Sequence, residues 1–86
     1  MATVRNVPKS AKATYLAYLT HKHGSAIPGS DLKVGQGVTF RNKNWSISGS
    51  DHRKDEPVQL RLVDVGLSRE VQGVTPDEVR PLLGGG

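Results

Sequence analysis

Two short alternating runs, at residues 38–40 (VTF) and 45–47 (WSI), constrain the fold of this chain more than any other feature. Strict alternation of apolar and polar residues is typical of a β-strand with one buried face. With a turn on residues 42–43, Phe40 lies opposite Trp45 and the four apolar side chains share one face. A slip of one residue would expose that face to water. The expected inward residues are Val38, Phe40, Trp45 and Ile47.

Two further strands are predicted after this hairpin. Residues 58–65 begin with an alternating run, Gly66 turns the chain, and residues 69–74 form the next strand with Val71 inward. The intervening segment 48–57 (SGSDHRKDEP) is polar throughout and is expected to be an exposed loop. Thr75-Pro76-Asp77-Glu78 has the pattern of a capping box with proline at the first helical position, which predicts a single helical turn.

A helix is expected near the N-terminus, over residues 11–23. Ser10 is placed to cap it, and Gly24 is placed to end it in a left-handed conformation. Its predicted apolar stripe consists of Tyr15, Leu16 and Leu19. The segment before it, residues 1–9, ends in Pro8-Lys9 and is expected to be an extended, mobile arm.

An 86-residue chain forms one domain with a single modest core. The expected organisation is an arm (1–9), a domain (10–83) with a helix (10–23) and a β-barrel (32–83), and a flexible glycine tail (84–86). The fold class is therefore α+β and mostly β, with four or five antiparallel strands. The fifth strand is supplied either by Val4–Val7 or by Leu82–Leu83.

The spacing of these elements resembles that of SH3-like small β-barrels, over about fifty residues. The residues that carry the resemblance are Val34-Gly-Gln-Gly-Val38, Trp45-Ser-Ile47, Val58-Gln-Leu60-Arg61, Gly66, Val71, Thr75-Pro76 and Leu82. At the same level the pattern is similar to the β-barrel domains that follow the catalytic domains of Mu-type transposases. The resemblance implies short twisted strands around a small core, with a helical turn before the last strand. It does not imply transposition.

The sequence predicts no catalytic residue, no cofactor site and no metal site. His21 and His23 are two residues apart on the predicted helix, so their side chains point about 200° apart and cannot share a metal ion. Ser50, Asp51 and His52 are neighbours in one predicted loop, where a catalytic triad rarely converges. The chain contains no cysteine, which excludes disulfides and thiolate metal sites.

The formal net charge is +4, so the distribution of basic residues decides what it means. Arg41, Lys43, Arg53 and Lys54 lie in two predicted loops that could meet at one end of the sheet and contact phosphates. Acidic residues at 51, 55 and 56 alternate with them, which favours a solvated, self-compensating surface instead.

The leading hypothesis is a non-catalytic structural or interaction protein, an accessory component of a phage-like virion assembly. An extended arm would lock it to other protein subunits, including copies of itself, through Val4, Arg5, Val7, Leu82 and Leu83. The alternative is a small basic nucleic-acid-binding barrel of phage or mobile-element origin. We expect no small-molecule substrate, no membrane partner and no signal peptide, and a cytoplasmic or virion-associated location.

Overall fold

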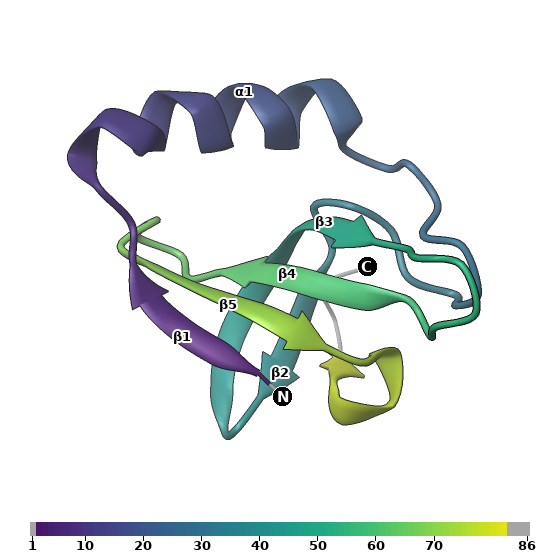
Figure 1. Cartoon of the computed structure of the whole chain (residues 1–86). Helices are drawn as coiled ribbons and strands as arrows, with labels where there is room; N and C mark the ends of the chain where they lie inside the picture. The colour runs from purple at the N-terminus through teal and green to yellow at the C-terminus, as the bar shows by residue number, and fades with distance from the viewer. Residues whose placement is uncertain (1, 83–86) are drawn as a thin grey trace.

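The computed structural model describes residues 2–82, which form one main helix and a six-stranded sheet (Figure 1). The elements are β1 (Thr3–Asn6), the 3-10 turn η1 (Lys9–Ala11), α1 (Lys12–Lys22), β2 (Gly37–Phe40), β3 (Lys43–Asp51), β4 (Gln59–Val63), β5 (Arg69–Val74), the 3-10 turn η2 (Pro76–Glu78) and β6 (Arg80–Pro81). The fold class is α+β and mostly β, as predicted.

All neighbouring strands of the sheet are antiparallel, and their order is β1-β5-β4-β3-β2-β6. Both candidates for the extra strand are used, because β1 pairs with β5 and β6 pairs with β2. The two outermost strands, β1 and β6, do not pair with each other within residues 2–82, so the sheet is open and a closed barrel is not formed there. The expected free arm is thus largely an edge strand.

The inner face of the sheet carries the hydrophobic core. The hairpin residues are all buried: Val38 and Ile47 are 0% exposed, Phe40 is 4% exposed and Trp45 is 5% exposed. The other core residues are Ile27, Leu32, Val34, Val58, Leu60, Leu62, Val71, Val74 and Val79. Every strand from β2 to β5, together with the loop before β2, therefore contributes to one core.

The predicted hairpin exists, but the predicted pairing of its two strands is wrong by two residues. The turn lies on Arg41-Asn42, with φ angles of 53° and 64°, so that Val38 pairs with Trp45 rather than with Ile47. Two successive left-handed residues are the geometry that matches the twist of a two-residue hairpin, and asparagine adopts it readily. Because the error is an even number of residues, the inward face is unchanged. In this register the indole N–H of Trp45 donates to the carbonyl of Phe40 at 3.1 Å.

The polar segment 48–57 is only partly a loop, since β3 continues to Asp51. The pairing of β3 with β4 shifts between Ile47 and Gly49, which is a β-bulge. Ser48 is buried there, and its hydroxyl donates to the carbonyl of Arg61 at 3.1 Å. A satisfied hydroxyl is tolerated inside a sheet, so the polar composition wrongly predicted a loop at this point.

The helix begins differently from the prediction. Ser10 does not cap it; instead, Ser10 lies inside η1, and the N-cap of α1 is Ala11, which makes no side-chain hydrogen bond. Pro8 has the extended geometry that precedes η1, and its carbonyl accepts from the N–H of Ala11 at 2.9 Å. At the other end, Gly24 has a φ of 84°, as expected for the residue that ends a helix.

Turns after β4 and β5 follow the sequence signals. The N–H of Thr75 donates to Glu78 Oε2 at 2.8 Å, and the predicted capping box of η2 is confirmed. Between β4 and β5, the carboxylate of Asp64 accepts from the N–H of Ser68 at 2.6 Å and from that of Arg69 at 3.1 Å. Within residues 2–82, no helix is both long and apolar enough to cross a membrane.

Candidate functional site

The outer edge of β1 is the first feature that could engage a partner. All four residues of Thr3–Asn6 are exposed, and the Val7 N–H donates to the Ser68 carbonyl at 2.8 Å. Hydrogen-bonded and free positions alternate along an antiparallel strand. The odd-numbered positions of β1 therefore face β5, whereas the backbone N–H and C=O of Val4 and Asn6 point outward. In the described part of the chain no strand pairs with these groups, which form a short, open sheet edge.

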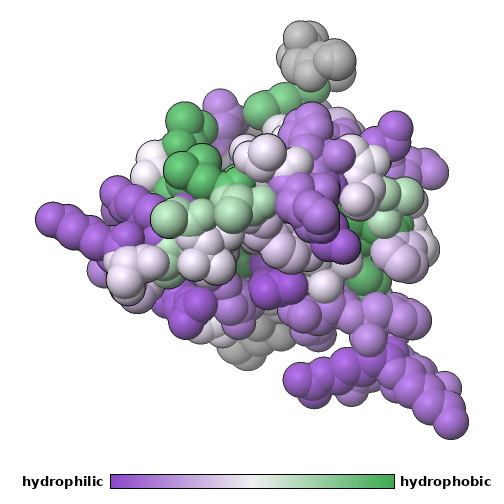
Figure 2. Space-filling model, turned by 90° about the horizontal axis from the view of Figure 1, so that it is seen from above, coloured by the Kyte–Doolittle hydropathy of each residue, from purple (hydrophilic) through white to green (hydrophobic). Residues whose placement is uncertain are grey.

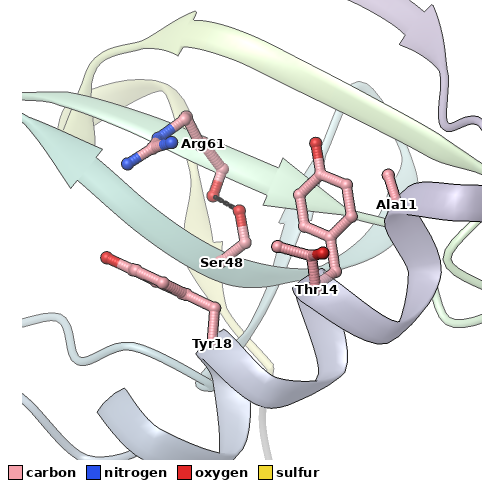
Figure 3. Close-up of a pocket in the computed structure, with 6 residues that line it drawn as sticks. Ala11, Thr14, Tyr18, Ser48 and Arg61 are labelled. Atoms are coloured by element: carbon pink, nitrogen blue, oxygen red, sulfur yellow. Dashed lines mark hydrogen bonds between the residues drawn. The ribbon is translucent and has the colours of Figure 1, made fainter.

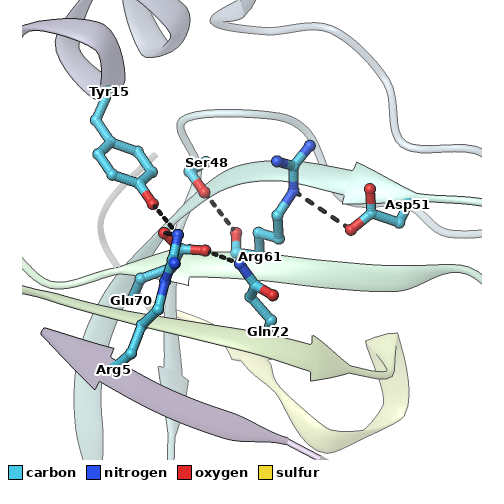
Figure 4. A network of polar contacts seen from close by, with 7 residues as sticks. All are labelled: Arg5, Tyr15, Ser48, Asp51, Arg61, Glu70 and Gln72. Atoms are coloured by element: carbon cyan, nitrogen blue, oxygen red, sulfur yellow. Dashed lines mark hydrogen bonds and ion pairs between the residues drawn. The ribbon is translucent and has the colours of Figure 1, made fainter. Parts of the chain in front are cut away.

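A buried carboxylate ties β1 to the outer face of the sheet (Figure 4). Glu70, on β5, is 1% exposed, and Arg5 Nη2 lies 3.1 Å from its Oε2. The amide of Gln72 donates to the other oxygen, Oε1, of the same carboxylate. Above this pair, Tyr15 of α1 accepts a long hydrogen bond from Arg5 at 3.5 Å. One cluster thus joins β1, β5 and α1.

A groove of about 280 Å³ separates α1 from the outer face of the sheet (Figure 3). Its lining residues are Ala11, Thr14, Tyr15 and Tyr18 from the helical segment, and Ser48 and Arg61 from β3 and β4. Within α1 no residue is buried, so the helix lies on the sheet without closing the space beneath it. Tyr15, Tyr18 and Leu19 are half-buried on the inward side, whereas Leu16, predicted to belong to the same stripe, is 55% exposed.

Arg61 is the cation of this groove. Its Nε lies 3.4 Å from Asp51 Oδ2, and Figure 4 draws this ion pair. Among the described residues the Nε has no aligned hydrogen-bond partner. Its guanidinium carbon lies 6.0 Å from the centre of the Tyr18 ring. A Cβ on Gly49 would come within 2.9 Å of the Tyr18 hydroxyl, so a larger residue at this bulge would displace the end of the Tyr18 side chain. The groove offers hydroxyl and guanidinium donors beside aromatic surface, and it contains no nucleophile positioned beside a base.

The predicted phosphate-binding residues are not brought together. Arg41 and Lys43 lie at the hairpin that starts β3, whereas Arg53 and Lys54 lie in the loop after it ends. Nine residues of strand span up to about 30 Å, and Figure 1 shows the two turns at opposite ends of β3. The expectation that these loops meet at one end of the sheet is wrong. Arg41 instead covers Phe40, with its guanidinium 5.0 Å from the ring centre.

The predicted assembly residues occupy different environments. Val4 is 48% exposed on the β1 edge, and Arg5 is engaged with Glu70. Val7 is only 7% exposed, so its side chain packs within this chain rather than facing a partner. Leu82 is half-buried, and its N–H donates to the carbonyl of Gly37 at 3.1 Å. Leu83 lies outside the described residues.

The histidines and the loop acids form no metal site within residues 2–82, where no group of three or more His, Cys, Asp or Glu side chains converges. His23 instead lies against Gly35, whose φ is 88°. The surroundings of Asp64 change its acidity. Partial burial acts to raise the pKa of Asp64, but hydrogen bonds from Ser68 and the backbone N–H groups of the turn outweigh it and lower the pKa below 3.8.

Sequence reasoning did not identify Glu70, Tyr18 or Arg61 as members of a site. Alternation places Arg61 and Glu70 on the face opposite Leu62 and Val71, which was the available signal. That a helix covers this face, and that Arg5 reaches Glu70 across 65 residues of chain, could not be derived from spacing. No protein-family model matches the chain, and neither a curated protein nor a solved structure shows significant similarity to it.

Proposed function

We propose that this protein is a non-catalytic interaction protein that joins other protein subunits through the free edge of β1. The observation that carries the proposal is the pair of outward backbone N–H and C=O sets at Val4 and Asn6 on an exposed strand. A partner strand can add to such an edge by main-chain hydrogen bonds, with side chains at alternate positions giving selectivity.

The Arg5–Glu70 pair supports this use of β1. It fixes a four-residue strand that would be marginal by itself, so the edge is held in the extended geometry that strand addition requires. In the specific form of the proposal, the protein is an accessory subunit of a phage-like particle, and its sheet is an SH3-like barrel left open between β1 and β6.

The structure changes how the role of the N-terminal segment should be tested. Deleting residues 1–9 would remove β1 and leave the carboxylate of Glu70 buried without Arg5, so the deletion would damage the fold. Val4→Pro is sharper, because it removes one outward N–H while the ladder to β5 uses the odd-numbered positions. Val4→Thr is the matched control, since it changes the same side chain and keeps the N–H.

The test is gradient sedimentation of tagged chain from the cells that naturally produce it. We expect the native chain and Val4→Thr in a fast-sedimenting fraction, and Val4→Pro as a slow monomer with an unchanged circular dichroism spectrum. Co-sedimentation of folded Val4→Pro with the native chain would refute the edge. The nucleic-acid alternative would be favoured instead if nuclease treatment releases the native chain from the fast-sedimenting fraction while the Val4→Pro chain still sediments in that fraction.

A further inference from the structure

The two edge strands of the sheet are not equally open to a further strand. Along β6 the Leu82 N–H donates to the Gly37 carbonyl, so the alternate position, Pro81, is the one that faces outward. Proline has no N–H to donate, and it is a common device for protecting a sheet edge. β1 contains neither proline nor lysine, and its pairing with β5 runs from Thr3 to Asn6 without a bulge. A strand can therefore add to β1, whereas β6 lacks the donor that such an addition needs.

The outward groups of β1 are arranged so that two copies of this strand can satisfy each other. In an antiparallel pair with Val4 opposite Val4 of the second copy, Ala2 of each copy lies opposite Asn6 of the other. These are the even-numbered positions, which face away from β5. Each opposed pair exchanges two main-chain hydrogen bonds, which gives about six in the whole contact.

The side chains favour this register over its neighbour. Val4 is 48% exposed and lies opposite Val71 of β5, so its side chain is on the face of the sheet that carries the core. With Val4 on the two-fold axis, the two valines cover each other, and Arg5 lies opposite Thr3 of the second copy. Arg5 also keeps its own Glu70, which offsets its charge within each copy. A two-fold axis at Arg5 would instead place two arginines directly opposite each other, which is destabilising.

We infer that the free edge of β1 binds β1 of a second copy of this chain, antiparallel and with Val4 on the two-fold axis. The inference rests on the proposed function, because it names the strand that occupies the same edge. Contact between β1 of one copy and β6 of another would meet Pro81, so the pairing closes as a dimer and does not extend into a fibre.

The size of the contact indicates a reversible dimer. A pair of short edge strands buries less than the standard interface of about 1,600 Å², so the dimer should form as the protein concentration rises. The helix side is a less continuous surface for a second copy. Figure 2, which views the molecule from that side, shows hydrophobic atoms in separate groups with hydrophilic side chains between them.

Single cysteines on β1 test the register without background reaction, because the chain contains no cysteine of its own. In the inferred dimer the two Val4 Cα atoms lie about 5.5 Å apart, whereas the two Asn6 residues lie about 14 Å apart along the strands. We expect a short bifunctional thiol reagent to cross-link Val4→Cys into a dimer at least about tenfold faster than Asn6→Cys. Ala2→Cys mixed with Asn6→Cys should give a cross-linked mixed dimer.

Light scattering of the uncross-linked proteins gives the second measurement. The native chain and Val4→Thr should shift from 9.3 kDa toward twice that mass as concentration rises, whereas folded Val4→Pro should stay at 9.3 kDa. Equal cross-linking of Val4→Cys and Asn6→Cys, or reaction of Val4→Cys with Asn6→Cys rather than with itself, would overturn the inference.

Failure of this inference can be told apart from failure of the proposed function. A native chain that stays at 9.3 kDa, with cysteine variants that do not react, would exclude the second copy. If Val4→Pro alone still lost the fast-sedimenting fraction, the β1 edge would stand as a contact with a different protein. Circular dichroism of each variant shows whether a loss of dimer reflects a loss of fold.

Discussion

Replacing Arg5 with methionine tests whether the buried carboxylate of Glu70 holds β1 on the sheet. Methionine keeps most of the aliphatic length of arginine but removes the guanidinium 3.1 Å from Glu70 Oε2. Glu70 is 1% exposed, so without Arg5 its charge has little water to replace the lost partner. The amide of Gln72 remains as its hydrogen-bond donor.

The expected loss of stability is about 2 kcal/mol. Breaking a fully buried ion pair costs about 3–5 kcal/mol, whereas an exposed pair contributes about 0–1 kcal/mol. This pair is intermediate, because the Arg5 side chain is 58% exposed and water screens it from one side. Glu70→Gln removes the buried charge itself, so the same Arg5→Met change made in that background should cost less than about 0.7 kcal/mol.

Urea unfolding of the four proteins of this double-mutant cycle at pH 7 gives the coupling directly. Hydrogen exchange at Val7, whose N–H donates to Ser68 in the β1–β5 ladder, reports whether β1 detaches before the rest of the sheet. Equal losses for Arg5→Met in both backgrounds would show that the buried charge does not hold β1, and would refute this account of the cluster.

Three other changes follow from single contacts. Asp64→Asn should have a lower free energy of unfolding than the native protein at pH 7, because the hydrogen bonds that lower the pKa of Asp64 stabilise its ionised form. The difference should shrink as the pH falls below 3.8 and the carboxylate becomes protonated. Equal urea midpoints at pH 7 would contradict this. Trp45→Phe should cost about 1–2 kcal/mol in thermal or urea unfolding, since it removes a buried indole hydrogen bond. Gly35→Ala should lower the free energy of unfolding more than Gly24→Ala does. Both residues have a positive φ, but an added Cβ at Gly35 would overlap the ring of His23, whereas a Cβ at Gly24 would meet nothing within 4 Å. Equal melting temperatures for these two variants would show that His23 moves away freely.

The hairpin shows how far pattern alone reaches. Alternation assigned Val38, Phe40, Trp45 and Ile47 to one buried face, and all four are buried. It could not choose between registers that differ by two residues, because both bury the same side chains. The register depended on which two residues of the turn take left-handed geometry, and these are Arg41 and Asn42. In this register the indole N–H of Trp45 also donates to the carbonyl of Phe40.

The groove and the cluster were less predictable than the core. Polar composition predicted a loop from residue 48, but the bulge keeps Ser48 inside a strand by satisfying its hydroxyl. Burial of Glu70 depends on Arg5, which is its neighbour only after β1 has paired with β5. Such long-range pairs leave no local periodicity in the sequence.

The sequence by itself determined the α+β class, the two-faced strands and the capped turn before β6, because these depend on local periodicity and turn chemistry. Only the tertiary structure decided that the N-terminal segment is an edge strand, that the basic loops lie at opposite ends of β3, and that α1 turns Leu16 away from the sheet. The physical reason is that each of these features depends on which surfaces meet when distant segments pack. Local pattern fixes which faces a segment has, but not what covers them.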